Sequence, residues 1–188
     1  MNKELIICVG ISGSGKSTWT TEYVKNNPGY LRINRDDIRK TLVGNLTPDY
    51  YKQKNLSDIE NLINTLEYSM FWAISRKFEG VIIDNTNLKS NYINKWVEAV
   101  DNFNQIMESS EAPQVCRVKF KLFDCTVDIA KERVYMRERG LQKVLCNILL
   151  HKERWSKDET LKYIDKQYND YQLIKKTILE KYPTQILE

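Results

Sequence analysis

One stretch near the start of the chain combines glycines, a lysine and hydroxyl groups at a spacing that suits phosphate binding. Residues 10–17 read Gly-Ile-Ser-Gly-Ser-Gly-Lys-Ser and fit the pattern G-x-x-x-x-G-K-[ST]. Glycines let such a loop turn tightly, so that consecutive backbone N–H groups point inward at an anion. Lys16 is expected to reach the β- and γ-phosphates of a nucleotide, and the Ser17 hydroxyl to ligate magnesium. The other nucleotide contacts expected from this loop are Gly10, Ser12, Gly13, Ser14, Gly15 and Thr18, and Arg133 and Arg137 are expected to contact the nucleotide from further along the chain.

The expected nucleotide is ATP, because the chain contains no N-K-x-D tetrapeptide that would read guanine. A glycine-rich turn that binds nothing is the alternative. The complete pattern between an apolar run and a helical segment favours a phosphate site. The loop alone does not say what receives the phosphate, since motors, switches and kinases all share it.

Two carboxylates and two arginines follow the second apolar stretch, in the sequence Asn-Arg-Asp-Asp-Ile-Arg at 34–39. The carboxyl ends of parallel strands meet at the ligand crevice, so Asp36 and Asp37 are expected near the phosphate loop. A carboxylate there can accept the proton of an attacking hydroxyl. Arg39, three residues after Asp36, can share its helix face and hold an acceptor phosphate or orient the carboxylate. The alternative is that the two aspartates only cap and charge a helix N-terminus.

A third polar group follows the apolar run at 81–83. Asp84 occupies the position from which a carboxylate can hold magnesium through water. The short polar side chains of Asn85, Thr86 and Asn87 are suited to contact an acceptor at the same rim. An Asx turn with Thr86 as a helix cap is the alternative.

Arginines also gather before Gly140. Arg133 and Arg137 are four residues apart on one predicted helix face, and Arg139 follows. We expect a mobile basic lid over about residues 131–143, which would stabilise the charge of a transferring phosphoryl group. A solvated basic helix face is the alternative. Residues 117–143 hold eight Lys and Arg against four Asp and Glu, an excess equal to the net charge of +4 of the whole chain. This placement suggests two anions, the nucleotide phosphates and an acceptor backbone.

The elements that must position these residues alternate between strand and helix. Apolar runs predict strands at 5–9, 30–34, 81–83 and 118–122, the last with one wetter face. Helices are expected from residue 16, from 37, at 57–78 with Ser57 as N-cap, at 91–103, at 127–137 ended by Gly140, and then at 144–155 and 157–180. The alternation predicts an α/β fold with a parallel sheet of about four strands, in one domain over residues 1–188.

Composition excludes several classes of protein. No apolar run approaches the ~20 residues of a membrane span or the apolar region of a signal peptide, so we expect a cytoplasmic chain. The four cysteines, Cys8, Cys116, Cys125 and Cys146, form no C-x-x-C pair, and His151 is the only histidine. We therefore expect buried reduced thiols and no structural metal site.

Four blocks together resemble a known family. Over about residues 4–142 the chain is similar to the kinase domain of bacteriophage polynucleotide 5′-kinase/3′-phosphatase. The four blocks that carry this similarity are G-x-S-G-S-G-K-S-T-W, N-P-G-Y…I-N-R-D-D-I-R, V-I-I-D-N-T-N-L and F-D…R-x-x-x-R-x-R-G. The resemblance implies a P-loop kinase fold and a role in nucleic acid repair. It also implies that Asp36 is the general base for the 5′-hydroxyl and that Arg39 engages acceptor and base. Arg133 and Arg137 match the lid arginines, with Arg139 as a rival to Arg137.

The chain departs from this family at two points. The phage enzyme carries an acidic residue where this chain has Asn85, which leaves open how Asp84 and Asn85 divide their roles. The D-x-D-G-T motif that opens the family's phosphatase domain does not occur, so we expect no 3′-phosphatase activity.

The resulting expectation is a kinase that transfers the γ-phosphate of ATP to the 5′-hydroxyl of DNA or RNA. A kinase of a small molecule or of a tRNA-linked group on the same scaffold is one alternative. A non-catalytic nucleotide-binding switch or a toxin-like module is the other.

Overall fold

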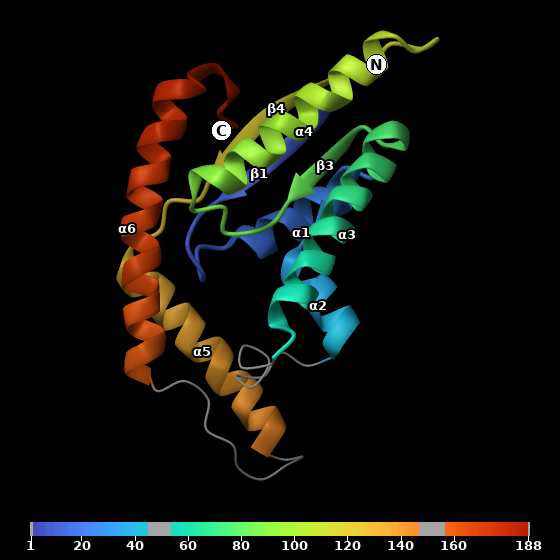
Figure 1. Ribbon diagram of the computed structural model, residues 1–188. Coiled ribbons are helices and arrows are strands. Elements are labelled where there is room, and N and C mark those ends of the chain that lie inside the picture. The colour runs from blue at the N-terminus through green and yellow to red at the C-terminus, as the bar shows by residue number, and fades with distance from the viewer. Residues whose placement is uncertain (1, 45–53, 147–156, 188) are drawn as a thin grey trace.

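A four-stranded sheet forms the centre of the molecule. The computed structural model describes residues 2–44, 54–146 and 157–187, without the side chains of 137–146 and 157–160. The strands β1 (Asn2–Val9), β2 (Tyr30–Ile33), β3 (Gly80–Ile83) and β4 (Val115–Leu122) are all parallel and lie in the order β2-β3-β1-β4 (Figure 1). The predicted α/β fold with a parallel sheet of four strands is confirmed.

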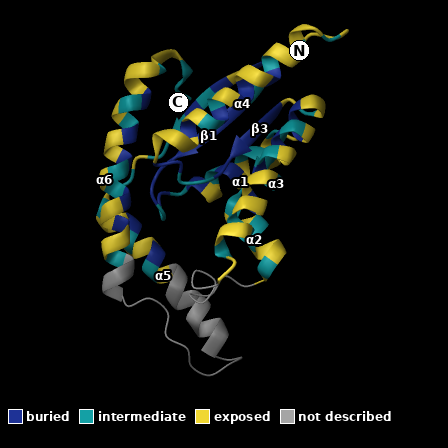
Figure 2. Ribbon diagram, viewed as in Figure 1, coloured by how far each residue is buried: buried dark blue, intermediate teal, exposed yellow. Residues whose placement is uncertain are grey.

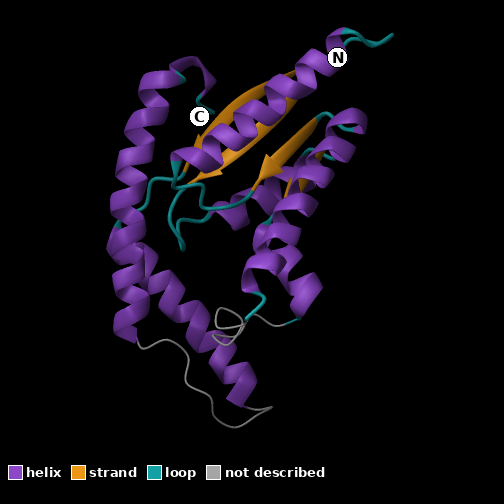
Figure 3. Cartoon of the chain, in the orientation of Figure 1, coloured by secondary structure: helices purple, strands orange, loops and turns teal. Residues whose placement is uncertain are grey.

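Helices connect the strands and cover the sheet (Figure 3). They are α1 (Lys16–Asn26), α2 (Arg35–Val43), α3 (Leu56–Lys77), α4 (Ser90–Glu108), α5 (Val127–Cys146) and α6 (Lys157–Lys181), followed by the short 3₁₀ helix η2 (Pro183–Gln185). No helix in the described part of the chain is long and apolar enough to cross a membrane.

Strand β1 is buried on both faces, as its continuous apolar run predicts (Figure 2). Leu5 and Ile7 face the larger core, which includes residues of α3, α4 and α6. Ile6 and Cys8 point the opposite way and pack with Trp19 of α1. Because successive residues of a strand alternate between faces, one run of five apolar residues supports both layers of helices.

The expectation of buried thiols is confirmed for Cys8 and Cys116, whereas Cys125 is only half-buried and the side chain of Cys146 lies outside the described residues. Cys8 and Cys116 are buried and free of disulfides. Burial raises the pKa of the Cys116 thiol to about 12, so this side chain stays protonated at neutral pH.

Two predicted helix boundaries are wrong. The N-cap of α3 is Asn55 and not Ser57, because the helix already begins at Leu56. Gly140 does not end α5, which continues to Cys146. One glycine inside a helix costs only about 1 kcal/mol relative to alanine, so favourable neighbours on both sides carry the helix through it. The helix predicted at 144–155 falls mostly on residues 147–156, outside the described residues.

The end of the chain returns to the open edge of the sheet. Ile186 forms a parallel bridge with Phe120, and the Leu187 N–H donates to the Phe120 carbonyl at 2.8 Å. Helix α6 contributes Ile174 and Ile178 to the core. The C-terminal segment is therefore part of the fold that holds β4 and the loop after it.

Candidate functional site

The carboxyl ends of the strands open onto one large pocket, with a volume of about 1260 Å³. It brings together residues that the sequence spreads over more than a hundred positions. The predicted site residues that line it are Ser12, Gly13, Ser14, Gly15, Lys16, Ser17, Thr18, Asp36, Arg39, Asp84, Asn85, Thr86, Asn87 and Arg133. Of the remaining candidates, Asp37 does not line the pocket and instead pairs with Arg32 at 2.6 Å. Gly10 lies at the base of the loop, and the side chains of Arg137 and Arg139 lie outside the described residues.

The glycine-rich loop between β1 and α1 has the geometry of a phosphate-binding loop. Gly13 and Gly15 have φ of +83° and +96°, in the left-handed region where other residues are strained. Gly15 is also the N-cap of α1, so the positive end of that helix points into the pocket. The Lys16 ammonium is buried and donates to the carbonyls of Gly10 at 2.9 Å and Ile11 at 2.7 Å.

Asp84 is fixed by three neighbours on one of its oxygens. Its Oδ2 accepts from Arg32 Nε at 2.6 Å, from Thr20 Oγ1 at 3.1 Å and from the Asn34 amide at 3.3 Å. Its Oδ1 is buried and accepts no hydrogen bond from any residue that the structure describes. Burial lowers the pKa of Arg32, but its hydrogen bonds and charge interactions with Asp84 and Asp37 raise this pKa by more, so the Arg32 guanidinium stays charged.

Asp36 and Arg39 face each other at the start of α2. The cap of this helix is Asn34, whose side chain accepts from the Asp37 N–H at 3.0 Å. The cap role proposed as an alternative for the aspartates is therefore taken by their neighbour. Asp36 is exposed, and its Oδ1 accepts from an Arg39 guanidinium nitrogen at 2.7 Å.

A second carboxylate fixes the other side of Arg39. Glu60 of α3 accepts from Nε and from a terminal nitrogen of Arg39, both at 2.8 Å. Burial lowers the pKa of Arg39, and the hydrogen bonds and charges of Glu60 and Asp36 raise it well above its ordinary value. The guanidinium is therefore permanently charged and held between two acids.

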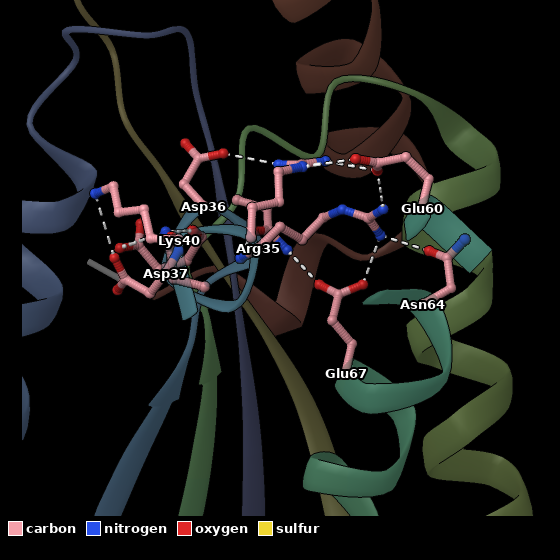
Figure 4. A network of polar contacts seen from close by, with 11 residues as sticks. Arg35, Asp36, Asp37, Lys40, Glu60, Asn64 and Glu67 are labelled. Carbon is pink, nitrogen blue, oxygen red and sulfur yellow. Dashed lines mark hydrogen bonds and ion pairs between the residues drawn. The ribbon is translucent and has the colours of Figure 1, made fainter. Parts of the chain in front are cut away.

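Glu67 is a site residue that the sequence analysis missed. It is buried at 1% exposure, and it accepts from Arg35 at 2.7 Å (Figure 4). It also accepts from the Asn85 amide at 2.9 Å and from Lys95 at 3.2 Å. Arg35 also donates to Glu60, which joins Glu67 to the Arg39–Asp36 pair. One feature of the sequence could have indicated Glu67. It lies four residues from each of Ile63 and Phe71, which are buried, so it shares their face of α3.

The residues after β3 hold the two sides of the pocket together. Asn85 Oδ1 accepts from the Arg35 N–H at 3.0 Å while its amide donates to Glu67. The Thr86 carbonyl accepts from the Gly10 N–H at 3.1 Å. Asn87 has φ of +49° and is 3% exposed, and its amide donates to the Cys8 carbonyl at 2.8 Å. Asn85 and Asn87 thus link neighbouring segments of the chain by hydrogen bonds. Asp84 is the only carboxylate among residues 84–87.

Helices α5 and α6 close the remaining side of the phosphate loop. Arg133 of α5 donates to the Gly13 carbonyl at 3.2 Å. Gln167 of α6, which the sequence analysis did not single out, accepts from the Ser12 N–H at 2.8 Å and is buried. Tyr171 packs in the core, whereas Tyr163 lines the pocket.

Comparisons with known proteins bear on the family and the fold of this chain. The chain is 30% identical over 146 residues to a protein of Autographa californica nuclear polyhedrosis virus provisionally named as a bifunctional polynucleotide kinase/RNA ligase. The match covers 72% of this chain and only 18% of the viral protein.

Two solved structures share the fold at lower identity. One, of a Pnkp1/Rnl/Hen1 RNA repair complex, aligns with a TM-score of 0.65 at 23% identity, over 93% of this chain and 46% of that one. The other, of the PezAT toxin–antitoxin system of Streptococcus pneumoniae, aligns with a TM-score of 0.55 at 17% identity, over 74% and 54%. Each of these proteins extends well beyond the part that this chain matches.

A family profile, described as an AAA domain, matches residues 5–144. This span contains the phosphate loop, the Asp36–Arg39 pair, Asp84 and Arg133. The viral relative agrees with the resemblance to polynucleotide kinases that the four sequence blocks indicate, and the solved structures confirm the fold. The chain belongs to the AAA domain family and has the P-loop kinase fold, which implies ATP binding.

Proposed function

We propose that this chain is an ATP-dependent polynucleotide kinase that phosphorylates the 5′-hydroxyl end of DNA or RNA. The observation that carries the proposal is the single pocket in which Lys16 of the phosphate loop and the Arg39-bound carboxylate of Asp36 both lie. A nucleotide donor and a hydroxyl acceptor placed in this pocket would meet between the two groups. Phosphoryl transfer depends chiefly on such positioning and on charge stabilisation.

The donor side is supported by the loop and by Asp84. ATP would place its phosphates against the loop N–H groups and the Lys16 ammonium, which would then exchange its bonds to the Gly10 and Ile11 carbonyls for phosphate oxygens. Magnesium bound with ATP would neutralise phosphate charge. The Ser17 hydroxyl and the unpaired Oδ1 of Asp84 are hard oxygen groups that fit a magnesium site, the carboxylate acting through water.

The acceptor side is supported by the acids and arginines of α2 and α5. Asp36 would accept the proton of the 5′-hydroxyl while the hydroxyl oxygen forms a bond to the γ-phosphorus of ATP. The bond between the γ-phosphorus and the β–γ bridging oxygen breaks at the same time, and ADP leaves. Arg39 would hold the acceptor and orient Asp36. Arg133, with Arg137 as its partner further along α5, would stabilise the charge on the transferring group.

A panel of acceptors tests the function. Purified protein would be mixed with γ-labelled ATP, magnesium and, in separate reactions, 5′-hydroxyl single-stranded DNA, single-stranded RNA, a tRNA-like end, or free nucleosides. We expect label on the 5′ end of at least one polynucleotide and none when that end is already phosphorylated. Label on nucleosides alone would assign the site to a small-molecule kinase, and no transfer with tight ATP binding would assign it to a switch.

A further inference from the structure

One face of helix α4 forms a wall of the pocket that neither the phosphate loop nor the Asp36–Arg39 pair explains. Lys89, Tyr92, Lys95 and Trp96 all line the pocket. Tyr92, Lys95 and Trp96 are spaced by three and four residues, which places them on one side of the helix, and Lys89 is the N-cap residue at its start. Two basic groups and two aromatic rings therefore form a continuous stripe along this wall.

The inner end of the stripe is rigid. Trp96 is buried, and its ring contacts that of Phe71 in the core with centroids 5.8 Å apart. The Lys95 ammonium lies 4.7 Å from the Trp96 ring centroid and 3.2 Å from Glu67. Because Glu67 also binds Arg35 of α2, this end of the stripe is joined to the segment that carries Asp36 and Arg39.

The outer end of the stripe is open. The Tyr92 side chain is 43% exposed although it lines the pocket, and Lys89 is exposed beside it. An aromatic ring and an ammonium group in this position offer a stacking surface next to a phosphate contact. Proteins that bind single-stranded nucleic acids combine these two features.

The pocket is also larger than a nucleotide donor requires. Sites for small molecules usually enclose about 300–1000 Å³, and this one encloses about 1260 Å³. The phosphate loop and Arg133 occupy one side, which leaves the α2 and α4 side for a second ligand.

We propose that the α4 stripe binds the first nucleotides of a single-stranded acceptor. Tyr92 stacks on the base of the first or second nucleotide, and Lys89 pairs with a backbone phosphate. The inference rests on the proposed function and deepens it, because it assigns the acceptor to single-stranded polynucleotides. A sugar or another small alcohol would not need an aromatic surface and a cation on a pocket wall that is separate from the phosphate loop.

Steady-state kinetics with a 5′-hydroxyl oligonucleotide test the stacking contact. A base stacked on an aromatic side chain strengthens binding, so Tyr92→Ala is expected to raise the KM for the oligonucleotide about tenfold. The KM for ATP is expected to stay within twofold, and Tyr92→Phe to behave as the wild type. Ile106→Ala, at an exposed position outside the pocket on the same helix, is the matched control.

An acceptor with an abasic site isolates the contact further. Removing the base of the first or the second nucleotide is expected to raise the wild-type KM as much as Tyr92→Ala does, with no further effect in that variant. Lys89→Ala is expected to reduce the dependence of oligonucleotide binding on salt. An unchanged KM for Tyr92→Ala with a base-bearing acceptor would overturn the inference.

Binding separates this inference from the proposed function. The affinity of the full chain for the same oligonucleotide would be measured with a non-hydrolysable ATP analogue present. Tyr92-dependent binding without any phosphate transfer would overturn the kinase proposal and leave the α4 site standing. Phosphate transfer that does not depend on Tyr92 would overturn the α4 site and leave the kinase proposal standing.

Discussion

Arg39 binds two carboxylates at once, and this arrangement explains how an exposed acid keeps a fixed position at the rim of a pocket. Asp36 is tethered by one guanidinium nitrogen, while Glu60 binds two others. The position of Asp36 and Arg39 in the pocket could be predicted, because they closely follow the end of a strand. Glu60 could not, because it lies on another helix and its contact depends on how α3 packs against α2.

Asn85 illustrates the same point for a residue whose role the sequence left open. A carboxylate is expected at this position from the resemblance to phage kinases, but the amide donates to the buried Glu67. An acid here would place two carboxylates in contact. The packing of Glu67, which the sequence does not reveal, thus determines why an amide suits this chain.

Replacing Asn85 with aspartate is therefore expected to destabilise the fold. The two like charges would repel each other, and the loss of stability should be about 1–3 kcal/mol at neutral pH, as for a buried polar group without its partner. Thermal unfolding of N85D and wild type measures this loss, and an unchanged midpoint would contradict the contact with Glu67.

At the scale of elements, the phosphate loop depends on a helix far along the chain. A Cβ on Gly13 would lie 2.6 Å from the Ala130 carbonyl oxygen of α5, and Arg133 of the same helix binds the Gly13 carbonyl. Helix α6 adds Gln167 on the neighbouring Ser12. The strands and the central parts of the helices could be predicted from apolar periodicity. The contacts of α5 and α6 with the phosphate loop could not, because they depend on tertiary packing.

The variant Gly13→Ala tests the contact between the loop and α5. It combines a clash with a left-handed φ of +83°, so we expect at least a tenfold loss of ATP affinity and ~1–3 kcal/mol of stability. Gly44→Ala is the control, because Gly44 has φ of +76° and no atom of the described residues lies within 4 Å of a new Cβ. Titration with ATP should find Gly44→Ala close to wild type, and equal affinities for the two variants would contradict the contact.

Helix α6 is held at the end of β4 by Asp124, which accepts from Lys175 at 2.6 Å and from the Tyr171 hydroxyl at 2.9 Å. Burial raises the pKa of Asp124, but these bonds lower it overall below its ordinary value of 3.8. The resulting stability is complete above the pKa of the unfolded chain and is lost as the pH falls through the lower folded value.

Asp124→Asn should therefore destabilise the chain only when the aspartate is charged. Because the side chain is 64% exposed, the effect should be small, ~0.5 kcal/mol at pH 7, and should vanish at about pH 2. Urea unfolding of both proteins at the two values measures it. A larger difference in acid than at neutral pH would reverse the assigned sign.

At the scale of the whole molecule, the basic excess at 117–143 is more evenly balanced than the sequence suggests. Lys119 pairs with Glu4 of β1, and Lys131 pairs with Asp165 of α6. Arg133 is directed at the phosphate loop. Ion pairs with distant segments thus use part of the charge that the sequence analysis attributed to two anionic ligands.

Transfer of the γ-phosphate from ATP to a 5′-hydroxyl oligonucleotide by wild type and by Asp36→Asn tests the central claim most directly. We predict transfer by the wild type and a loss of ~10²–10⁴-fold in kcat for D36N, with ATP affinity within twofold. Near-normal turnover by D36N would contradict the role of Asp36 as the base. Absence of transfer by the wild type to every polynucleotide end would contradict the kinase itself.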